Sequence, residues 1–304
     1  MRHWPEHRNH STVIRNLTEK QNEGIKAHNV SVIYPNGHKA LWDASFILPQ
    51  GTVCGLVGIN GAGKSTLFKA MMGFTKLSRG SISIMGRTVS EALKENLISY
   101  VPQTEQVDWT FPVLVEDVVM MGRFGHMGFL RIPRKADHEA VEQALQRVNM
   151  QDYRYRQIGE LSGGQRKRVF LARAIAQNGH VILLDEPFTG VDVHTEEQII
   201  KLMLDLREEG RIILVSTHNL GSVPEFCDRT ILIKGTILRY GETETTFTQE
   251  NLQQAFGGVL RYFTLSGKTL HEDSDSRAVT ILTDDERPLV QYDGKTKTKE
   301  GKSK

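Results

Sequence analysis

The chain has 304 residues, enough to bury a hydrophobic core without disulfides or metals, and its length predicts one large or two small domains. Apolar residues make up 39% and charged residues 24%, as in ordinary globular proteins. The 38 Lys and Arg nearly balance the 36 Asp and Glu, which argues against a protein that coats nucleic acid. No apolar run reaches the roughly 18 residues of a transmembrane helix, and residues 1–10 lack the apolar core of a secretory signal. The two cysteines, Cys54 and Cys227, form no C-x-x-C pattern, so we expect a cytosolic protein without structural disulfides.

The amino-terminal part is predicted to be a tail followed by β-strands. Residues 1–24 are polar, carry mixed charge and show no periodicity, so we expect a loose tail. Apolar stretches separated by Pro, Asn and Gly predict three strands: Ile25–Ile33, Ala40–Leu48 and Thr52–Val57. The third strand runs into a glycine-rich segment, after which apolar residues recur at helical spacing from Ser65 to Gly73.

Strands alternate with helices through the rest of the ordered chain. Short apolar runs predict four more strands, at Ser81–Met85, Ile98–Val101, Val181–Leu184 and Ile212–Ser216. Amphipathic periodicity predicts helices at Ala136–Met150 and Gln165–Ala176. The segment Thr195-Glu-Glu-Gln198 resembles a capping box, so we expect a helix that begins there and ends at Gly210. This alternation favours an α/β fold with a parallel sheet.

The carboxyl-terminal part changes in composition. Residues 271–287 are rich in Asp, Glu and Ser, and residues 295–304 are basic and of low complexity. We therefore expect residues 266–304 to form a polar, disordered tail. The alternative is that its lysines contact a polyanion or a membrane surface.

A glycine-rich loop carries the first chemical motif. The pattern G-x-x-x-x-G-K-S lies between a predicted strand and a predicted helix, as a P-loop requires. Its glycines let backbone N–H groups turn toward phosphate oxygens, and the helix adds its positive end. We expect Lys64 to reach the β- and γ-phosphates and the Ser65 hydroxyl to bind Mg²⁺. The nucleotide-binding residues predicted on this loop are Gly58, Asn60, Gly61, Ala62, Gly63, Lys64, Ser65 and Thr66.

Two further motifs complete a phosphate-handling set. The apolar strand Val181–Leu184 ends in two carboxylates, of which Asp185 is placed to hold Mg²⁺ and Glu186 to orient and deprotonate water. A Ser and two glycines precede a predicted helix in Leu161-Ser-Gly-Gly-Gln165, which makes a second anion site. One P-loop and one separate phosphate-binding turn predict that two chains share each nucleotide.

These motifs, in this order, resemble the ATP-binding cassette (ABC) ATPase family over about residues 25–245. The resemblance implies an α/β P-loop NTPase with a RecA-like parallel-sheet core, an N-terminal antiparallel β subdomain and an α-helical signature subdomain. It implies an ABC ATPase domain at residues 25–265, with the helical subdomain at about residues 104–178.

The resemblance also implies a role for each matching residue. Tyr34 stands where the family stacks an aromatic ring on adenine, and Gln103 matches the glutamine that senses Mg²⁺ and the membrane subunit. His218 matches the histidine that holds the γ-phosphate. Asp192 matches the D-loop aspartate, although Gly190 and Val191 replace the commoner Ala-Leu.

Three sets of residues follow from these matches. The catalytic residues implied are Glu186, His218 and Gln103. The Mg²⁺ ligands implied are Ser65, Gln103 and Asp185. The signature motif, which acts on the ATP of a partner chain, is implied at Leu161, Ser162, Gly163, Gly164 and Gln165.

The region after Gln103 is similar to the ATPase subunits of manganese and iron importers, above all in Val107–Arg123 and Gly125–Phe129. This similarity implies an ATP-hydrolysing subunit, with Mg²⁺ and ATP, that drives import of a divalent metal, manganese or iron. It implies a homodimer at the cytoplasmic face of the membrane, bound to integral membrane permease subunits, and indirectly an extracytoplasmic metal-binding protein. No nucleic-acid partner is expected. Exposed aromatic residues that suit the permease contact are Trp109, Phe111 and Phe129, unless they are core.

Other interpretations are weighed against this one. A soluble ABC-type ATPase acting on DNA or ribosomes is disfavoured, because Lys64 and Ser162 are only 98 residues apart with no heptads between them and the chain has one cassette. A P-loop kinase or GTPase leaves Leu161–Gln165 and His218 unexplained. A transporter for zinc or a metal chelate remains an alternative. The ordered part shows no dense His, Cys and carboxylate cluster, so we do not expect this chain to select the metal.

Overall fold

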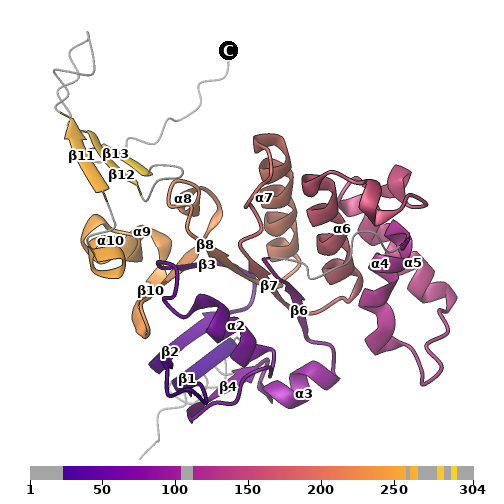
Figure 1. The fold of residues 1–304 in the computed structure, drawn as a ribbon, viewed down its shortest axis with the longest axis horizontal. Helices are drawn as coiled ribbons and strands as arrows, with labels where there is room; N and C mark the ends of the chain where they lie inside the picture. Colours follow the sequence, from indigo (N-terminus) through magenta and orange to yellow (C-terminus); the bar gives the residue numbers. More distant parts are fainter. Residues whose placement is uncertain (1–22, 104–111, 258–260, 266–278, 284–288, 293–304) are drawn as a thin grey trace, which may run out of the picture.

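The computed structural model describes residues 23–103, 112–257, 261–265, 279–283 and 289–292 (Figure 1). The predictions for residues 1–22 and the aromatic residues Trp109 and Phe111 lie outside the described residues. Within the described part, no helix is long and apolar enough to span a membrane.

A four-stranded antiparallel sheet begins the fold, and its strands follow the order β2-β1-β4-β5. They are β1 (Glu23–Ile33), β2 (Lys39–Pro49), β4 (Arg79–Ile84) and β5 (Arg87–Thr88). The first two match the predicted strands to within two residues at each end. A short helix, α3 (Val89–Lys94), follows β5 and begins at a capping box formed by Thr88 and Glu91.

A six-stranded sheet in the order β10-β9-β3-β8-β7-β6 forms the centre of the molecule (Figure 1). Its strands are β3 (Thr52–Val57), β6 (Ile98–Val101), β7 (Val181–Asp185), β8 (Ile212–Thr217), β9 (Arg229–Ile233) and β10 (Ile237–Glu242). All neighbouring pairs are parallel except β9 and β10. The predicted parallel sheet is therefore confirmed, and the loops that leave the carboxyl ends of β3, β7 and β8 lie at one edge, where ligands bind in such sheets.

Helices cover this central sheet. Those of eight residues or more are α2 (Lys64–Met71), α5 (Lys135–Arg147), α6 (Gly163–Ala176), α7 (Val193–Glu208) and α10 (Gln249–Phe256). Shorter helices and turns are α4 (Val115–Met120), η1 (Met121–His126), η2 (Gln151–Tyr153), η3 (Ile158–Glu160), α8 (Val223–Phe226) and α9 (Thr243–Thr246). Figure 1 shows α4, α5 and α6 grouped on the side away from the antiparallel sheet.

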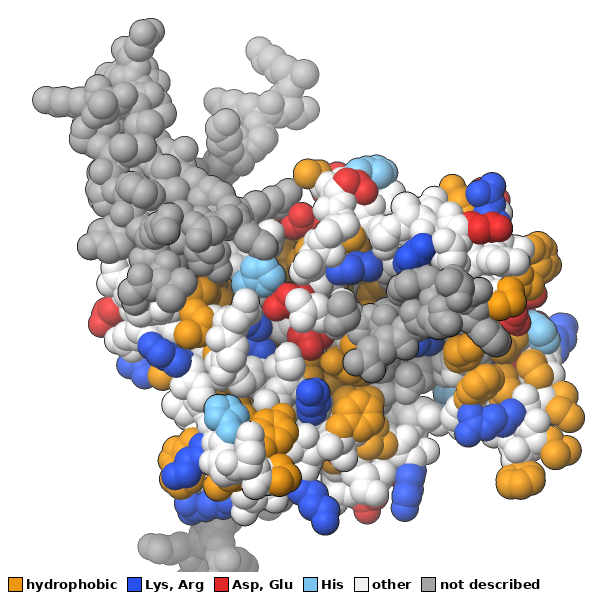
Figure 2. Space-filling view, viewed as in Figure 1, with side chains coloured by type: hydrophobic (Ala, Val, Ile, Leu, Met, Phe, Trp, Pro, Cys, Tyr) orange, Lys and Arg blue, Asp and Glu red, His pale blue; other side chains and the backbone are white. Residues whose placement is uncertain are grey.

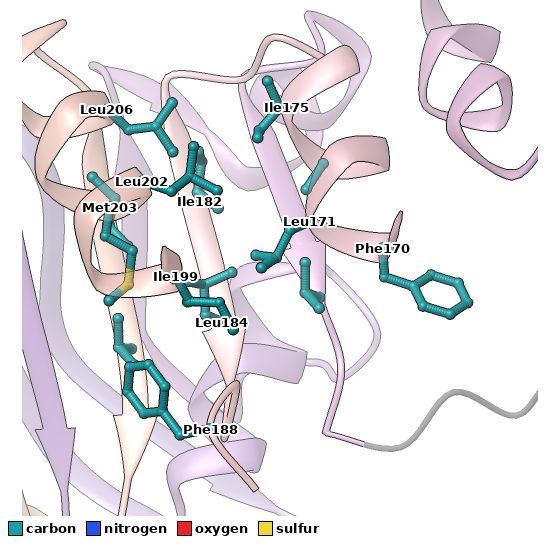
Figure 3. Close-up of a cluster of buried hydrophobic side chains, with 14 of the residues drawn as sticks. Phe170, Leu171, Ile175, Ile182, Leu184, Phe188, Ile199, Leu202, Met203 and Leu206 are labelled. Atoms are coloured by element: carbon teal, nitrogen blue, oxygen red, sulfur yellow. The ribbon is translucent and has the colours of Figure 1, made fainter. Parts of the chain in front are cut away.

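Alternate residues of each central strand enter two different cores, because successive side chains of a strand point to opposite faces. In β8, Ile213 and Val215 enter the core shared with α4–α7, whereas Ile212 and Leu214 enter the core shared with the antiparallel sheet and α2. Each such side chain contributes about 1.5–3 kcal/mol of hydrophobic stabilisation. Figure 3 shows α6 and α7 packing over β7 through Leu171, Ile175, Ile182, Leu184, Ile199, Leu202, Met203 and Leu206.

The start of α7 differs from the sequence prediction. The helix begins at Val193, and its cap is Asp192, whose carboxylate accepts hydrogen bonds from the backbone N–H and the hydroxyl of Thr195, each at 2.9 Å. The prediction of a capping box at Thr195–Gln198 is wrong. Asp is as good an N-cap as Thr, and Asp192 caps the helix three residues before Thr195. Thr195 is instead buried in the first turn.

Two of the three strands of a third sheet lie within the range predicted to be disordered, residues 266–304. Strands β11 (Arg261–Leu265), β12 (Val279–Thr283) and β13 (Leu289–Tyr292) pair antiparallel in that order. The prediction is wrong for β12 and β13, because two runs rich in β-branched and aliphatic residues are hidden between polar segments that dominate the composition. The rest of residues 266–304 lies outside the described residues.

Candidate nucleotide-binding site

A cavity of about 420 Å³ lies at the edge where β3, β7 and β8 end. Its lining comes from segments far apart in the sequence: Tyr34, His38, Ala40, Ile59, Asn60, Gly61, Gly63, Lys64, Ser65, Thr66, Gln103, Glu186, Thr189 and His218. Two predicted nucleotide-binding residues stand just behind it. The Gly58 carbonyl accepts a hydrogen bond from Lys64, and Ala62 is a buried core residue. Within this cavity the chain brings together the glycine-rich loop with Lys64 and the carboxylate of Glu186.

The glycine-rich loop leaves the start of α2 open toward the cavity. Gly63 is the cap of α2, with φ of +105°, and a Cβ there would lie 2.8 Å from the Ala40 carbonyl oxygen and 2.7 Å from Leu41 Cδ2. A glycine is therefore required, and it carries no side chain that could cap the helix. The first N–H groups of a helix have no partner within the helix, so those of α2 are available to an anion.

Lys64 provides the positive side chain of this loop. Its ammonium Nζ donates to the carbonyl of Gly58 at 2.6 Å and lies 3.4 Å from that of Ile59, and the residue is buried. The positive charge of Lys64 also helps to lower the pKa of the Glu186 carboxylate, which lines the same cavity. The loop therefore holds its cation against its own backbone, within the lining of the cavity.

Strand pairing positions the first of the two carboxylates. Asp185 pairs with Ser216 across β7 and β8, and its Oδ1 accepts a hydrogen bond from the Ser216 hydroxyl at 2.5 Å. Its Oδ2 accepts one from the hydroxyl of Tyr100 at 3.4 Å. Asp185 is buried and does not line the cavity, although it directly precedes Glu186, which does.

Glu186 sits in a strained backbone turn at the end of β7. Its φ is +50°, a left-handed conformation that costs a non-glycine residue about 1–3 kcal/mol. Two hydrogen bonds from its N–H hold the turn, to the Ser216 carbonyl at 3.1 Å and the Ser216 hydroxyl at 3.0 Å. The strain places the Glu186 carboxylate in the cavity rather than along the strand.

The predicted catalytic side chains converge on the Glu186 carboxylate. Gln103 Nε2 donates to Oε2 at 2.5 Å, and His218 Nδ1 lies 3.3 Å from Oε1. The interaction with His218 lowers the pKa of Glu186 most, the charges of His218 and Lys64 lower it further, and burial opposes them. Glu186 is therefore ionised at neutral pH and able to accept a proton.

The predicted Mg²⁺ ligands offer a hydroxyl, an amide and a carboxylate, from Ser65, Gln103 and Asp185. Oxygen donors with few protein carboxylates suit Mg²⁺, which takes its remaining ligands from phosphates and water. Ser65 and Gln103 line the cavity. Among the described residues, no group of three or more His, Cys, Asp and Glu is placed to hold a metal ion. The hydroxyl of Ser65 and the amide of Gln103, both in the lining, are donors that suit Mg²⁺ arriving with a nucleotide.

The signature motif lies outside the cavity of its own chain. Ser162 is exposed and caps α6: its hydroxyl accepts from the Gln165 N–H at 3.3 Å, and Gln165 Oε1 accepts from the Ser162 N–H at 2.9 Å. Leu161 is buried and anchors the turn. A Cβ on Gly164 would lie 3.3 Å from Thr195 Oγ1, so the start of α6 packs closely against the start of α7.

Sequence reasoning missed two residues that touch this site. Lys167, on α6, donates hydrogen bonds from Nζ to the carbonyls of Glu186 at 3.2 Å and Pro187 at 3.3 Å. No sequence motif predicts this contact, because its acceptors are backbone atoms 19 and 20 residues away. His38 lines the cavity, and the signal available for it was its place across a turn from Tyr34.

Comparison with known proteins decides the family. A family model described as ABC transporter matches residues 41–189, which hold the P-loop, the signature motif and Glu186. The chain is 64% identical over 269 residues to the chelated iron transport system membrane protein YfeB of Yersinia pestis, covering 88% of this chain and 90% of that protein. The chain belongs to the ABC transporter family.

Other relatives of this ABC transporter chain agree. It is 57% identical to the manganese transport system ATP-binding protein MntA of Synechocystis, over 77% of this chain and 90% of that protein. Its fold matches a chain of a metal-chelate type ABC transporter solved in an inward-facing conformation, with a TM-score of 0.71, 28% identity, and coverage of 88% and 98%. It also matches a nucleotide-free ATP-binding cassette with a TM-score of 0.66, 25% identity, and coverage of 77% and 94%.

These findings confirm the predicted family, fold class and activity. The ABC transporter chain is the ATP-binding subunit of a transport system and an ATPase whose activity is coupled to transport. The kinase and GTPase interpretations are wrong, and transport is favoured over a soluble role on DNA or ribosomes.

Proposed function

We propose that this ATPase drives the import of manganese or iron, as a homodimer bound to integral membrane permease subunits at the cytoplasmic face of the membrane. The observation that carries the proposal is the 64% identity to a chelated iron transport protein together with the 57% identity to a manganese transport protein. A zinc transport system ATP-binding protein, TroB of Treponema pallidum, is 42% identical over 72% of this chain. The sequence identities therefore support manganese or iron as the substrate more strongly than zinc.

The proposed mechanism uses the cavity lining together with Asp185, the residue directly before Glu186. Tyr34 contacts the adenine, while Lys64 and the N–H groups at the start of α2 hold the phosphates. Ser65, Gln103 and Asp185 would hold Mg²⁺, which would neutralise charge on the phosphates. These interactions fix the γ-phosphate at the end of the cavity that faces Glu186.

Glu186 is the proposed general base. Its low pKa keeps the carboxylate unprotonated at neutral pH, so it can orient a water molecule and take its proton as the water attacks the γ-phosphate. Gln103 and His218 each engage one carboxylate oxygen and so fix the direction in which Glu186 presents its remaining lone pairs. His218 also lines the cavity, where it is placed to contact the γ-phosphate.

A second copy completes the proposed site. The Gly163 and Gly164 N–H groups at the start of α6 and the Ser162 hydroxyl form an anion-binding turn outside the cavity of the same chain. In the homodimer, Leu161–Gln165 of each chain contacts the γ-phosphate held by the other. Asp192, which caps α7 beside that turn, lies where it would support the contact.

An apolar surface beyond η1 is the proposed permease contact. Phe129 is fully exposed, and Leu130 and Ile132 are 76% and 65% exposed, so the alternative that Phe129 is a core residue is wrong. Figure 2 shows hydrophobic side chains interspersed with Lys and Arg over this helical side of the molecule. An amphipathic segment of a membrane subunit would bury these three side chains. The metal passes through that subunit, which with an extracytoplasmic binding protein would select it.

The test is metal uptake by the assembled transporter. The chain is coexpressed with its permease subunits, reconstituted in vesicles, and assayed for ATP-dependent uptake of manganese, iron and zinc. We expect uptake of manganese or iron and none with Glu186→Gln, while Phe129→Ser with Leu130→Ser lowers copurification of the permease. Uptake of zinc in preference to both other metals would overturn the substrate assignment and leave the ATPase assignment standing.

A further inference from the structure

A single buried hydroxyl contacts both of the acidic residues at the end of β7. Ser216 is fully buried near the carboxyl end of β8, a strand whose six residues are all buried. The parallel register pairs Ser216 with Asp185, the last residue of β7, which directly precedes Glu186. A buried hydroxyl normally has hydrogen-bond partners, and Ser216 has one on each of these two residues.

The groups involved fix the direction of these two hydrogen bonds. The backbone N–H of Glu186 can only donate, and it donates to Ser216 Oγ at 3.0 Å. The Ser216 hydroxyl has one proton of its own, which it donates to Asp185 Oδ1 at 2.5 Å. A chain of two hydrogen bonds therefore runs from the backbone of Glu186 to the carboxylate of Asp185. Hydrogen bonds in such a chain polarise and strengthen one another inside a protein.

Asp185 and Glu186 depend on this hydroxyl to different degrees. The Glu186 N–H also donates to the Ser216 carbonyl at 3.1 Å, a bond that no side-chain substitution removes. Asp185 Oδ2 accepts a longer hydrogen bond, at 3.4 Å, from the hydroxyl of Tyr100. The shorter bond from Ser216 therefore does most to set the direction of the Asp185 carboxylate, whereas it shares the Glu186 turn with a backbone carbonyl.

The end of β8 also positions the side chain of Glu186. His218 follows Ser216 by two residues, and its Nδ1 lies 3.3 Å from Glu186 Oε1. Ser216 thus holds the backbone of Glu186, while His218 contacts its carboxylate. Because Ser216 also holds Asp185, one strand end contacts both acidic residues and fixes their relative position.

We propose that Ser216 is a positioning residue for ATP hydrolysis, which holds the Asp185 carboxylate in a fixed direction relative to the Glu186 turn. This inference rests on the proposed roles of Asp185 toward Mg²⁺ and of Glu186 as general base. Ser216 does not line the cavity, so it acts through these two residues and not on the nucleotide. A carboxylate free to rotate presents its oxygens in several directions, and catalysis is sensitive to small misplacements.

The first test compares Ser216→Ala with a matched buried serine. ATP hydrolysis is measured on the chain assembled with its permease subunits, where Ser216→Ala should lower kcat about tenfold and change the KM for ATP by less than about threefold. Ser99→Ala is the control, because Ser99 is fully buried on β6 and donates to the Ala174 carbonyl at 3.0 Å. Its kcat should stay within about twofold of wild type. Wild-type kcat in Ser216→Ala would overturn the proposal.

The second test measures ATP binding without hydrolysis. The Glu186→Gln background prevents turnover, and ATP affinity is measured by titration calorimetry with Mg²⁺ and again with EDTA. Asp185 is proposed to act through Mg²⁺, so its direction affects ATP only when the metal is present. We expect Ser216→Ala to weaken ATP binding about threefold with Mg²⁺ and to leave it unchanged with EDTA. Equal losses in both conditions would show that Ser216 does not act through Asp185.

Asp185→Asn in the same titrations separates this proposal from the proposed function. If Asp185→Asn weakens ATP binding only with Mg²⁺ while Ser216→Ala changes neither affinity, the role of Asp185 stands and the positioning role of Ser216 is wrong. If Asp185→Asn leaves the affinity with Mg²⁺ unchanged, the assignment of Asp185 to Mg²⁺ in the proposed function fails instead.

A conservative variant separates positioning from folding. Ser216→Thr keeps the hydroxyl in a strand, where β-branched residues are favoured, and should recover kcat to within about threefold of wild type. Thermal unfolding of Ser216→Ala, Ser216→Thr and Ser99→Ala is measured in parallel. We expect Ser216→Ala and Ser99→Ala to lose similar stability but only Ser216→Ala to lose kcat. A kcat that follows the unfolding temperature in all three variants would mean that Ser216 is only structural.

Discussion

Two helices of this chain, α2 and α6, begin at glycine-rich turns. The two turns differ in whether they satisfy the first backbone N–H groups of the helix. Before α2 stands Gly63, which has no side chain, so the first N–H groups of that helix face the cavity. Before α6 stands Ser162, which closes a capping box with Gln165 and satisfies two donors within the turn. The first turn is built to receive an anion, whereas the second is already partly satisfied.

The starts of α2 and α6 also differ in how deeply their residues are buried. Lys64 is buried in the cavity wall beside Glu186, while Ser162 is exposed and apart from that cavity. The open start of α2 is therefore available to an anion within one chain. The start of α6 keeps only the Gly163 and Gly164 N–H groups outside its box, so it needs a ligand presented from elsewhere. The comparison supports a site that one chain opens and a second chain completes.

The largest expected effect comes from Glu186→Gln, which breaks catalysis but leaves both turns intact. The amide keeps the shape of the carboxylate yet cannot take a proton, so ATP hydrolysis should fall by roughly 10²–10⁴-fold. ATP binding should survive because Lys64 and α2 are unchanged. Phosphate release and ATP titration measure the two effects. Hydrolysis at the wild-type rate would remove Glu186 from the role of general base.

Lys64→Ala removes the positive charge at the start of α2. Removing the buried cation should weaken ATP binding by about 2–5 kcal/mol, since truncating one partner of a buried charge pair costs that much. Equilibrium titration with ATP measures the loss, and circular dichroism checks that the fold is kept. Lys69→Ala, an exposed lysine later in α2, is the matched control. Near-normal ATP affinity in Lys64→Ala would contradict the anion site.

Ser162→Arg tests the turn before α6. In the Glu186→Gln background, bound ATP should hold two chains together by mass action, giving an ATP-dependent dimer on size exclusion. Arginine at position 162 should abolish that dimer by its bulk while leaving ATP binding to the monomer within about twofold. Light scattering with and without ATP measures both states. A dimer that tolerates Ser162→Arg would mean that the turn before α6 does not face the partner's nucleotide.

The smallest expected effect concerns the link between the two turns. Lys167 on α6 bonds the carbonyls of Glu186 and Pro187, so Lys167→Ala should let the strained Glu186 turn relax and lower kcat about tenfold. The KM for ATP should hardly change, because the phosphate contacts remain. Lys167→Gln keeps a donor and should recover part of kcat. An equal change in kcat and in ATP affinity would indicate general damage to the fold.

The sequence predicts most of the features that are set by residues close together in the chain. The P-loop, the two carboxylates after β7 and the alternation of strands and helices all follow from short patterns, and the structure confirms the α/β fold. The start of α7 was misplaced because Thr195–Gln198 and Asp192 offer competing caps within three residues. The strands β12 and β13 were missed because a polar composition hid their short apolar runs.

Other features need the fold before they can be seen. The contact of Lys167 with the Glu186 carbonyl joins a helix to a strand end, and no spacing rule links them. Ser216 meets Asp185 only because β7 pairs with β8 in one particular register. His38 meets Tyr34 through a local turn, so this contact was within reach of the sequence once the hairpin loop is read residue by residue.

The bond from Lys167 to the Glu186 carbonyl also sets a thermodynamic condition on the whole subunit. If a displacement of α6 weakens nucleotide binding by some free energy, nucleotide binding must resist that displacement by the same free energy. The bond joins α6 to the backbone of the Glu186 turn, so this condition would apply to any displacement of α6 that moves that turn. Because α6 also packs on β7 through Leu171 and Ile175, a displacement of α6 reaches the Glu186 turn through this bond and through the apolar contacts together.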